Sequence, residues 1–378
     1  MKQLRCALLA LLMLLSLTVP AAAEELTVEA QACLLMEKTT GEVLYAVNEH
    51  EQLEPASVTK VMTLLLVMEA IDSGALSYDD TVTASAYACS MGGSQIWLEE
   101  NEQMTVEELL KAVCVASAND ASVALAEHIA GSAEAFVERM NQRAAELGMA
   151  DTHFVNPTGL PAEGHVTSAY DIALMSRELI WRHPDIRRFT TIWMDSLRDG
   201  AFGLNNTNKL IRYYEGATGL KTGSTDSALY CLSATAERDG MELIAVILKS
   251  PTSDKRFEGA KTLLNYGFAV YGLADAAPEE PLPAIPVRLG TAASVPVELA
   301  GQESLLTTRE KLGTLATTVE LEEELTAPVE KGQRVGTLTV TAGDEVLAEL
   351  PLAAAEAVER LSYGQILLRC LRMAFLGG

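Results

Sequence analysis

The chain is poor in basic residues and in histidine for its length. Its 378 residues include 28 Lys and Arg, 52 Asp and Glu and five His, which gives a formal charge of -24 at pH 7. This excess of negative charge argues against nucleic acid as a partner. The histidines show neither H-E-x-x-H nor any other close ligand spacing, so we expect no metal site: His50, His128, His153, His165 and His183.

Other chemical motifs are also missing. The sequence lacks a glycine-rich phosphate loop and a Gly-x-Ser-x-Gly elbow, and we expect no cofactor. Cysteines are few and lack C-x-x-C spacing, and most of them lie in apolar runs, so we interpret them as small buried hydrophobic residues. One disulfide is compatible with the sequence but cannot be assigned among Cys33, Cys89, Cys114, Cys231 and Cys370.

Residues 1–23 predict a secretory signal peptide. Lys2 and Arg5 give a positively charged start, residues 6–19 are almost all apolar, and the alanines at 21–23 offer a cleavage site. No cysteine directly follows the apolar run, so we do not expect a lipid anchor. The sequence therefore predicts an exported protein.

The first part of the mature chain predicts a β-hairpin followed by a buried helix. Two apolar runs between residues 28 and 47 flank a short turn. Pro55 then precedes a strongly apolar stretch at 58–71, and Gly74 follows it, which is the usual punctuation of a helix. Ser57 is therefore expected at a helix N-terminus.

Helices and strands are expected to alternate up to about residue 275. Thr105 and Glu108 form a capping-box pattern at the start of one helix. Early and late strands with helices between them predict an α/β (α+β) fold, in which a mixed antiparallel sheet is covered by helices. The expected helices are at 109–115, 121–130, 132–147 and 168–181, and the expected late strands are near 219–223, 230–236 and 241–248.

Composition changes after the expected sheet. Four prolines interrupt regular structure in 276–286, and residues 287–350 alternate apolar and polar side chains, so we predict a linker and a small β domain. A helix with one polar stripe is expected at 353–376, and its two arginines favour a helix on the membrane surface over a membrane span. The predicted domains are 24–275, 284–352 and 353–378.

Ser57-Val58-Thr59-Lys60 places a hydroxyl and an amine three residues apart, on one face of the expected helix. Serine is a weak nucleophile without a base. A lysine that is partly desolvated and close to other positive charge can have its pKa lowered enough to accept the serine proton. The helix N-terminus can also stabilise a nearby oxyanion.

Two further motifs accompany this pair. Ser117 and Asn119 lie between two expected helices, and Lys221-Thr222-Gly223 lies on an expected strand. Taken singly, each has an ordinary structural explanation: a helix cap, a turn residue or an edge strand. Their order and structural context together argue against a chance occurrence and predict a serine nucleophile with a lysine base.

These motifs resemble those of the serine D,D-peptidases, specifically the low-molecular-mass penicillin-binding proteins of D-alanyl-D-alanine carboxypeptidase type. The resemblance covers Ala30 to about Phe268. The later β domain and the amphipathic tail are similar by pattern to the membrane-tethered members. The matching stretches are Pro55-Ala56-Ser57-Val58-Thr59-Lys60, Gly92-Gly93-Ser94, Ala116-Ser117-Ala118-Asn119-Asp120-Ala121, His153-Phe154-Val155-Asn156-Pro157-Thr158-Gly159-Leu160, Gly219-Leu220-Lys221-Thr222-Gly223 and Leu263-Leu264-Asn265-Tyr266-Gly267-Phe268.

The resemblance implies a set of catalytic residues. Ser57 would attack the carbonyl between two D-alanines while Lys60 takes its proton. Ser117 and Lys221 would pass a proton to the departing D-alanine, and Asn119 would hold the amide backbone of the substrate.

The resemblance also implies a substrate-binding strand. Lys221, Thr222, Gly223 and Ser224 would bind the substrate, with the backbone N–H groups of Ser57 and Ser224 forming an oxyanion hole. Thr222 and Arg256 would contact the terminal carboxylate. Ser224 and Thr218 depart from the family, where an aromatic or histidine and an acidic residue are common, which puts substrate affinity and pH dependence in doubt.

The implied partners are peptidoglycan stem peptides that end in D-alanyl-D-alanine, β-lactam antibiotics as inhibitors, and the membrane surface. The implied location is the extracytoplasmic face of the cytoplasmic membrane. A β-lactamase of the same fold is one alternative, although Glu163 is the only glutamate in the 148–164 loop that could position a deacylating water. A non-catalytic sensor of wall peptides or antibiotics is another, although binding alone would not require Lys60 or Lys221.

Overall fold

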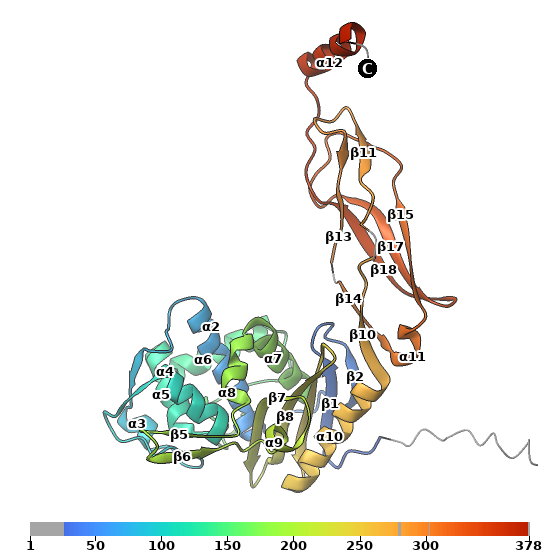
Figure 1. The fold of residues 1–378 in the computed structure, drawn as a ribbon. Coiled ribbons are helices and arrows are strands. Elements are labelled where there is room, and N and C mark those ends of the chain that lie inside the picture. The colour runs from blue at the N-terminus through green and yellow to red at the C-terminus, as the bar shows by residue number, and fades with distance from the viewer. Residues whose placement is uncertain (1–25, 279–280, 302, 377–378) are drawn as a thin grey trace, which may run out of the picture.

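The computed structural model describes residues 26–278, 281–301 and 303–376. The predicted signal peptide lies outside these residues. Figure 1 shows a broad part built from a sheet and helices, and an elongated β part that carries a helix at its far end. The two parts join where the long helix α10 (Ser253–Val270) passes into strand β10 (Tyr271–Asp275).

A five-stranded sheet forms the centre of the broad part. Its strands follow the order β2-β1-β9-β8-β7, and every neighbouring pair is antiparallel. The expected hairpin and the three late strands are therefore confirmed. The strands are β1 (Ala32–Glu37), β2 (Val43–Val47), β7 (Ala217–Thr225), β8 (Leu229–Arg238) and β9 (Met241–Ser250).

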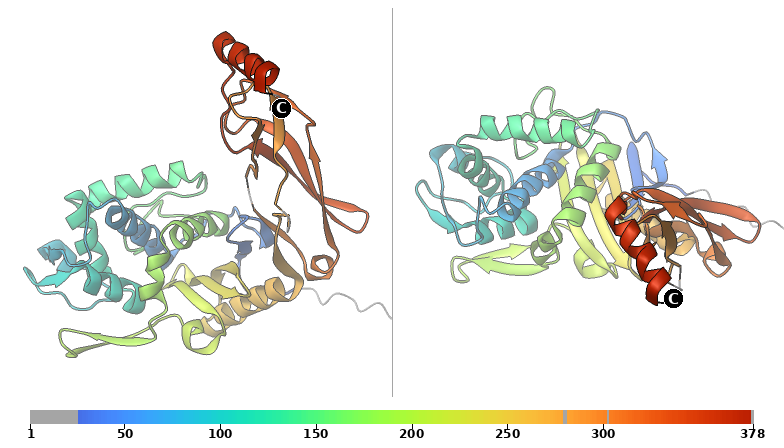
Figure 2. Two further views of the ribbon diagram at one scale, coloured as in Figure 1. Left: turned by 45° about the horizontal axis from the view of Figure 1, so that its top comes forward. Right: turned by 90° about the horizontal axis from the view of Figure 1, so that it is seen from above.

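Helices cover both faces of this sheet (Figure 2). Strand β1 is buried along its whole length, and alternate side chains enter two different cores. Leu34 and Met36 pack in the core that includes α2 (Lys60–Asp72), α5 (Asn119–Ala130) and α7 (Ala169–Arg182). Leu35 packs in the smaller core under α10. Burial on both faces explains the unbroken apolar run of β1.

The expected helices are present, with shifted ends. The Thr105 hydroxyl accepts the backbone N–H of Glu108, whose carboxylate accepts the N–H of Thr105, so the predicted capping box is confirmed. The remaining helices of this part are η1 (Ala56–Thr59), α3 (Ala86–Cys89), α4 (Val106–Lys111), η2 (Ala112–Ala116), α6 (Ala133–Glu146), η3 (Pro184–Ile186), α8 (Arg187–Thr190) and α9 (Leu210–Tyr213).

Several elements were not expected from the sequence. The pairs β3 (Thr81–Thr83) with β4 (Gln103–Thr105) and β5 (Met194–Leu197) with β6 (Phe202–Asn205) form two small ribbons, and α10 was also missed. Helix α5 begins at Asn119, two residues before the predicted start.

The elongated part contains the β domain expected from the sequence. It holds a small core of its own around Ile285, Val335 and Val358. Strands β10 and β14 pair with each other, β11 pairs in parallel with β16, and a four-stranded sheet follows the order β13-β18-β17-β15. The elements are β11 (Ile285–Arg288), β12 (Ser294–Val295), β13 (Val297–Leu299), β14 (Ser304–Thr308), α11 (Arg309–Leu312), β15 (Leu315–Leu321), β16 (Leu325–Thr326), β17 (Arg334–Ala342) and β18 (Glu345–Ala354).

The predicted start of the C-terminal helix at residue 353 is wrong. Ala353 and Ala354 are buried at the end of β18, where they pair with β13. Helix α12 (Tyr363–Leu376) begins later because Ser362 and Gln365 form the capping hydrogen bonds of its first turn. Within the ranges that the structure describes, no helix combines the length and apolar character needed to cross a membrane.

The cysteines of the described residues are free thiols. Three of them are buried, as the interpretation of the sequence predicted, and burial raises the pKa of the Cys33 and Cys231 thiols to about 11. The five cysteines are Cys33, Cys89, Cys114, Cys231 and Cys370.

Candidate active site

Ser57 and Lys60 meet at the start of the buried helix. Ser57 lies in the 3₁₀ turn η1, and Lys60 begins α2 with no exposed surface. The Lys60 Nζ atom is 2.9 Å from Ser57 Oγ, 2.6 Å from Asn119 Oδ1 and 2.7 Å from the carbonyl oxygen of Thr158. Three segments that are distant in sequence therefore converge on one amine.

These contacts orient the amine toward Ser57. The oxygens of Asn119 and Thr158 can only accept, so each takes an N–H of Lys60. Burial lowers the pKa of Lys60 well below its usual value, and the positive charge of Lys221 lowers it further, while Asp120 opposes the shift. With two of its N–H groups donated to these oxygens, a neutral Lys60 amine would direct its lone pair toward the Ser57 hydroxyl. The geometry is therefore compatible with the predicted role of Lys60 as a base.

Lys221 is the second buried amine of the region. Its side chain is 1% exposed, and its Nζ donates to the carbonyl of Thr222 at 2.9 Å. Burial, reinforced by the charge of Arg256, lowers its pKa to about 7. Ser117 is also buried and adopts a left-handed backbone with φ of 64°. Among the described residues, the Ser117 hydroxyl makes no hydrogen bond to either lysine.

Strand β7 passes very close to the Ser57 turn. A Cβ atom on Gly223 would lie 2.8 Å from the Ser57 backbone nitrogen and 2.8 Å from the Pro55 carbonyl oxygen. Only glycine permits this approach of two backbones. The next residue, Ser224, is exposed at the end of the strand, and the Thr222 hydroxyl donates to that of Thr207 at 2.7 Å.

Arg256 contacts this strand from α10. Its Nη1 donates to the carbonyl oxygens of Gly223 at 3.1 Å and of Cys231 at 3.2 Å, which are opposite residues of β7 and β8. Burial lowers its pKa to about 10. Its Nε atom is buried and has no hydrogen-bond partner among the described residues. The guanidinium therefore fixes the position of Gly223.

Sequence reasoning assigned no role to several residues that build the site. The Gly92 carbonyl accepts the Asn119 side-chain amide at 2.6 Å, and the Ser94 carbonyl accepts the Asn119 backbone N–H at 2.7 Å. The buried carboxylate of Asp120 accepts the backbone N–H groups of Ile96 and Leu98. The sequence signal for these contacts was the Gly92-Gly93-Ser94 stretch, which resembles the family but to which we assigned no function.

Thr158 was missed as a ligand of Lys60 for a similar reason. The Asn156 side chain accepts the N–H groups of Thr158 and Gly159 and shapes a tight turn. A Cβ atom on Gly159 would lie 1.8 Å from the Ala56 carbonyl oxygen, so only glycine fits at this position. The Asn-Pro-Thr-Gly sequence was the available signal.

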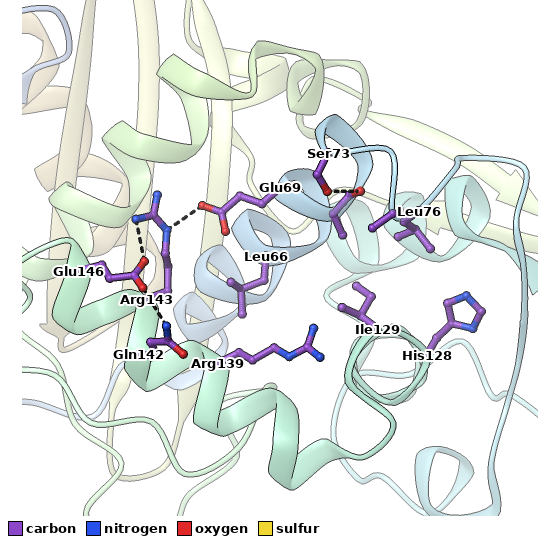
Figure 3. Close-up of a pocket in the computed structure, with 12 residues that line it drawn as sticks. Leu66, Glu69, Ser73, Leu76, His128, Ile129, Arg139, Gln142, Arg143 and Glu146 are labelled. Atoms are coloured by element: carbon purple, nitrogen blue, oxygen red, sulfur yellow. Dashed lines mark hydrogen bonds and ion pairs between the residues drawn. The ribbon is translucent and has the colours of Figure 1, made fainter.

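A separate cavity of about 610 Å³ lies at the opposite end of α2 (Figure 3). It is lined by residues of α2, α5 and α6, among them Leu66, His128 and Arg143. Arg143 pairs there with Glu69 at 2.7 Å. None of the site residues predicted from the sequence lines this cavity, so the candidate active site is the convergence at the other end of the helix.

Comparison with known proteins matches both parts of the chain. A family model described as D-alanyl-D-alanine carboxypeptidase matches residues 19–252, and a model described as the C-terminal domain of penicillin-binding protein 5 matches residues 279–360. The chain belongs to the D-alanyl-D-alanine carboxypeptidase family. The carboxypeptidase is 42% identical to D-alanyl-D-alanine carboxypeptidase DacF of Bacillus subtilis, with 98% of each chain covered. It is 33% identical to D-alanyl-D-alanine carboxypeptidase DacC of Escherichia coli, and the matched region covers 88% of this chain and 85% of DacC.

Solved structures confirm the fold predicted from the sequence. Penicillin-binding protein 5 from Haemophilus influenzae superimposes on the carboxypeptidase with a TM-score of 0.79 and 30% identity, covering 88% of this chain and 98% of that one. A penicillin-binding protein from Listeria monocytogenes in its ampicillin-bound form gives a TM-score of 0.59 and 34% identity, covering 64% of this chain and 98% of that one.

The comparisons also confirm the predicted class of activity. The carboxypeptidase is a serine-type D-alanyl-D-alanine carboxypeptidase that acts on the cell wall, outside the cytoplasm. The relatives described above are named carboxypeptidases or penicillin-binding proteins, which agrees with the first prediction rather than with the two alternatives. The roles of individual site residues stay predictions from the sequence and its family resemblance.

Proposed function

We propose that the carboxypeptidase removes the terminal D-alanine from peptidoglycan stem pentapeptides through an acyl-enzyme on Ser57. The observation that carries this proposal is the buried Lys60 amine, held 2.9 Å from Ser57 Oγ by two acceptors on other segments. A neutral amine in this position takes the serine proton as Oγ attacks the carbonyl carbon. The backbone N–H groups of Ser57 and Ser224 stabilise the resulting oxyanion.

The second half of the reaction releases D-alanine and then the shortened peptide. The carbon–nitrogen bond breaks, and the departing amine takes a proton that Ser117 and Lys221 deliver. The Lys221 pKa of about 7 fits this role because the amine can hold or release a proton near neutral pH. Water then hydrolyses the ester on Ser57, and the proton that it loses returns to the lysine network.

Substrate binding in this proposal uses both walls of the site. Asn119 holds the amide backbone of the peptide from one side. Lys221, Thr222, Gly223 and Ser224 line the other side along β7. Thr222 binds the terminal carboxylate, and the positive charge of Arg256 behind Gly223 attracts it.

Penicillins acylate the same serine in this proposal. Support comes from the relative with an ampicillin-bound structure, which is 34% identical and covers 64% of this chain. The test is the intact mass of the purified protein after brief exposure to benzylpenicillin, beside a Ser57→Ala variant. One penicilloyl adduct on the wild type alone is expected. No adduct with intact antibiotic would overturn the acyl-enzyme proposal, and rapid antibiotic destruction without a lasting adduct would favour a β-lactamase.

We also propose that α12 holds the enzyme at the extracytoplasmic membrane surface. Leu367, Leu368 and Leu371 are exposed on this helix, and Arg369 lies among them, which suits an interfacial helix. Deleting residues 362–378, which leaves β18 and the core residue Val358 in place, should release active enzyme into the soluble fraction, and continued membrane association would contradict the proposal. High salt should release the full chain poorly, because apolar burial dominates over attraction to anionic lipid.

A further inference from the structure

A second cavity lies on segments that lead to the candidate active site. Its volume is about 520 Å³, and it belongs to none of the residues assigned a role above. Two segments line it, the loop after Ser94 and the ribbon formed by β5 and β6. The lining residues are Trp97, Glu99, Glu102, Arg198, Ala201 and Phe202.

Trp97 is held rigidly and yet points its ring into solvent. Its side chain is 66% exposed, and its backbone adopts φ of 58°, which is unfavourable for a bulky residue. The neighbouring N–H groups of Ile96 and Leu98 donate to the buried Asp120 carboxylate. Arg198 donates to the Trp97 carbonyl oxygen at 3.3 Å. A strained backbone that presents an exposed indole is typical of a binding surface.

Both walls of the cavity continue into the active site. On one side, the chain runs from Trp97 back to Ser94, whose carbonyl accepts the Asn119 backbone N–H. Three residues span at most about 11 Å of chain, so Trp97 stays close to Asn119. On the other side, the lining residue Phe202 begins β6, and Thr207, five residues further along the chain, accepts the Thr222 hydroxyl. Five residues span at most about 18 Å, so the cavity lies within the length of a short extended peptide from β7.

The charges of the lining select the ligand. Arg198 donates to both carboxylate oxygens of Glu102, at 2.7 and 3.0 Å, so these two charges compensate each other. Within the described residues, the Glu99 carboxylate makes no ion pair or hydrogen bond. Glu99 interacts with Arg198 only through its charge, so the two carboxylates and one guanidinium leave the lining with one net negative charge, beside the exposed ring of Trp97. A cation matches both features, because it is attracted by the net negative charge and by the face of the indole ring.

We propose that this cavity is a subsite for a primary ammonium group, carried by a side chain of the peptide on the amino-terminal side of the scissile bond. The inference rests on the proposed carboxypeptidase function. It adds a substrate preference that the catalytic residues by themselves do not create, because none of them lines the cavity.

The test compares two peptides that end in D-alanyl-D-alanine and differ only in one upstream lysine, free or acetylated at its side-chain nitrogen. The lysine is placed in turn at the first and at the second position before the D-alanine pair. The wild type should release D-alanine from a free-amine peptide with a kcat/KM about three- to tenfold higher than from its acetylated partner. Trp97→Ala and Glu99→Gln should each reduce this ratio toward one.

Matched controls separate the subsite from general effects. Glu100→Gln removes an adjacent exposed charge outside the lining, and Trp181→Ala removes another exposed tryptophan, on α7. Both should keep the wild-type ratio. Equal kcat/KM for both peptides at both positions, or a preference that survives Trp97→Ala and Glu99→Gln, would overturn the subsite. Failure of the proposed function is distinguishable, because it would abolish D-alanine release from every peptide and the penicilloyl adduct in all variants.

Discussion

The two parts of the carboxypeptidase bury different kinds of side chain. The broad part buries charged residues on both sides of its sheet, among them Glu37, Lys60, Lys221, Glu242 and Arg256. In the described residues of the elongated part, the buried polar side chain is Thr307, and the core is made of aliphatic residues. Burying a charge is costly, so the broad part has a use for these groups that the elongated part lacks.

The buried charges of the broad part fall into two kinds. Glu242 is fully paired, with Lys38 at 2.9 Å and with Arg187, and it ties the hairpin turn to β9 and α8. Lys60 and Lys221 have no carboxylate partner among the described residues, and burial lowers the pKa of both. Paired charges hold the structure together, whereas unpaired amines with lowered pKa values are typical of catalytic groups.

The sharpest test of this contrast replaces the buried amine of Lys60 with an apolar side chain of similar length. Lys60→Met should lower the second-order rate constant of acylation by benzylpenicillin about 10³-fold, because within the described part of the chain no other amine or imidazole hydrogen-bonds to Ser57. The protein should still fold, because the loss of a buried amine offsets part of the cost of leaving the Asn119 and Thr158 oxygens without its N–H donors. Lys331→Met, at an exposed position of the elongated part, is the control and should keep the wild-type rate. A rate within tenfold of wild type in Lys60→Met would contradict the assignment of the base.

The second contrast compares a glycine of the broad part, which the backbone of another segment approaches closely, with an open glycine of the elongated part. In Gly223→Ala, the new methyl group would meet Ser57 N at 2.8 Å and would push β7 away from the nucleophile. We expect acylation to slow about 10²-fold, since a displacement of about 1 Å at an active site has effects of this size. Gly313→Ala is the matched control, because nothing lies within 4 Å of a Cβ atom there and φ is -75°. Equal acylation rates in the two variants would refute the close approach.

The two parts should also differ in their response to acid. Burial lowers the pKa of His165 to about 4, and its ring bonds Val155 N–H at 3.0 Å and the Thr59 hydroxyl at 2.8 Å. The folded pKa lies below the unfolded value of 6.5, so this group stabilises the fold above pH 6.5. That contribution, about 3 kcal/mol, is lost as the pH falls from 6.5 through 4.

Hydrogen exchange followed by mass spectrometry measures this difference on the whole chain. Between pH 7 and pH 5, after correction for intrinsic rates, protection in residues 153–166 should fall more than protection in β17 and β18. A His165→Gln variant should lose this pH dependence, while His128→Gln, at an exposed position on α5, should keep it. An equal loss of protection in both parts of the wild type would show that His165 does not control the acid response.

The smallest effect is expected from removing the elongated part. A chain that ends at Asp275 retains the sheet, all helices of the broad part and every residue of the site. Acylation by benzylpenicillin should stay within about twofold of the full chain, as expected from solved relatives that span only 64% of it. A loss above tenfold in a truncated protein with native circular dichroism would show that the elongated part shapes the site.

Much of the fold and of the site could be predicted because the signals are local. A proline and a glycine mark the buried helix that follows Ser57, and apolar runs mark the late strands, among them β7 with Lys221. The predicted first residues of α5 and α12 were wrong because the true starts depend on contacts with residues distant in the sequence. Ala354, for example, is held in β18 because it pairs with Val297 of β13. The residues around Ala354 in the sequence have a helical pattern and do not reveal this pairing.

The sequence by itself determined the family and the order of the three motifs, and it predicted the nucleophile and the base, because each motif is a short run of residues in one element. Only the tertiary structure decided what surrounds them. It brought the Thr158 carbonyl to Lys60, placed Arg256 behind Gly223, and joined the loop of Trp97 to the β5–β6 ribbon. Burial and proximity lower the pKa values of Lys60 and Lys221, and both arise only when segments distant in sequence pack together.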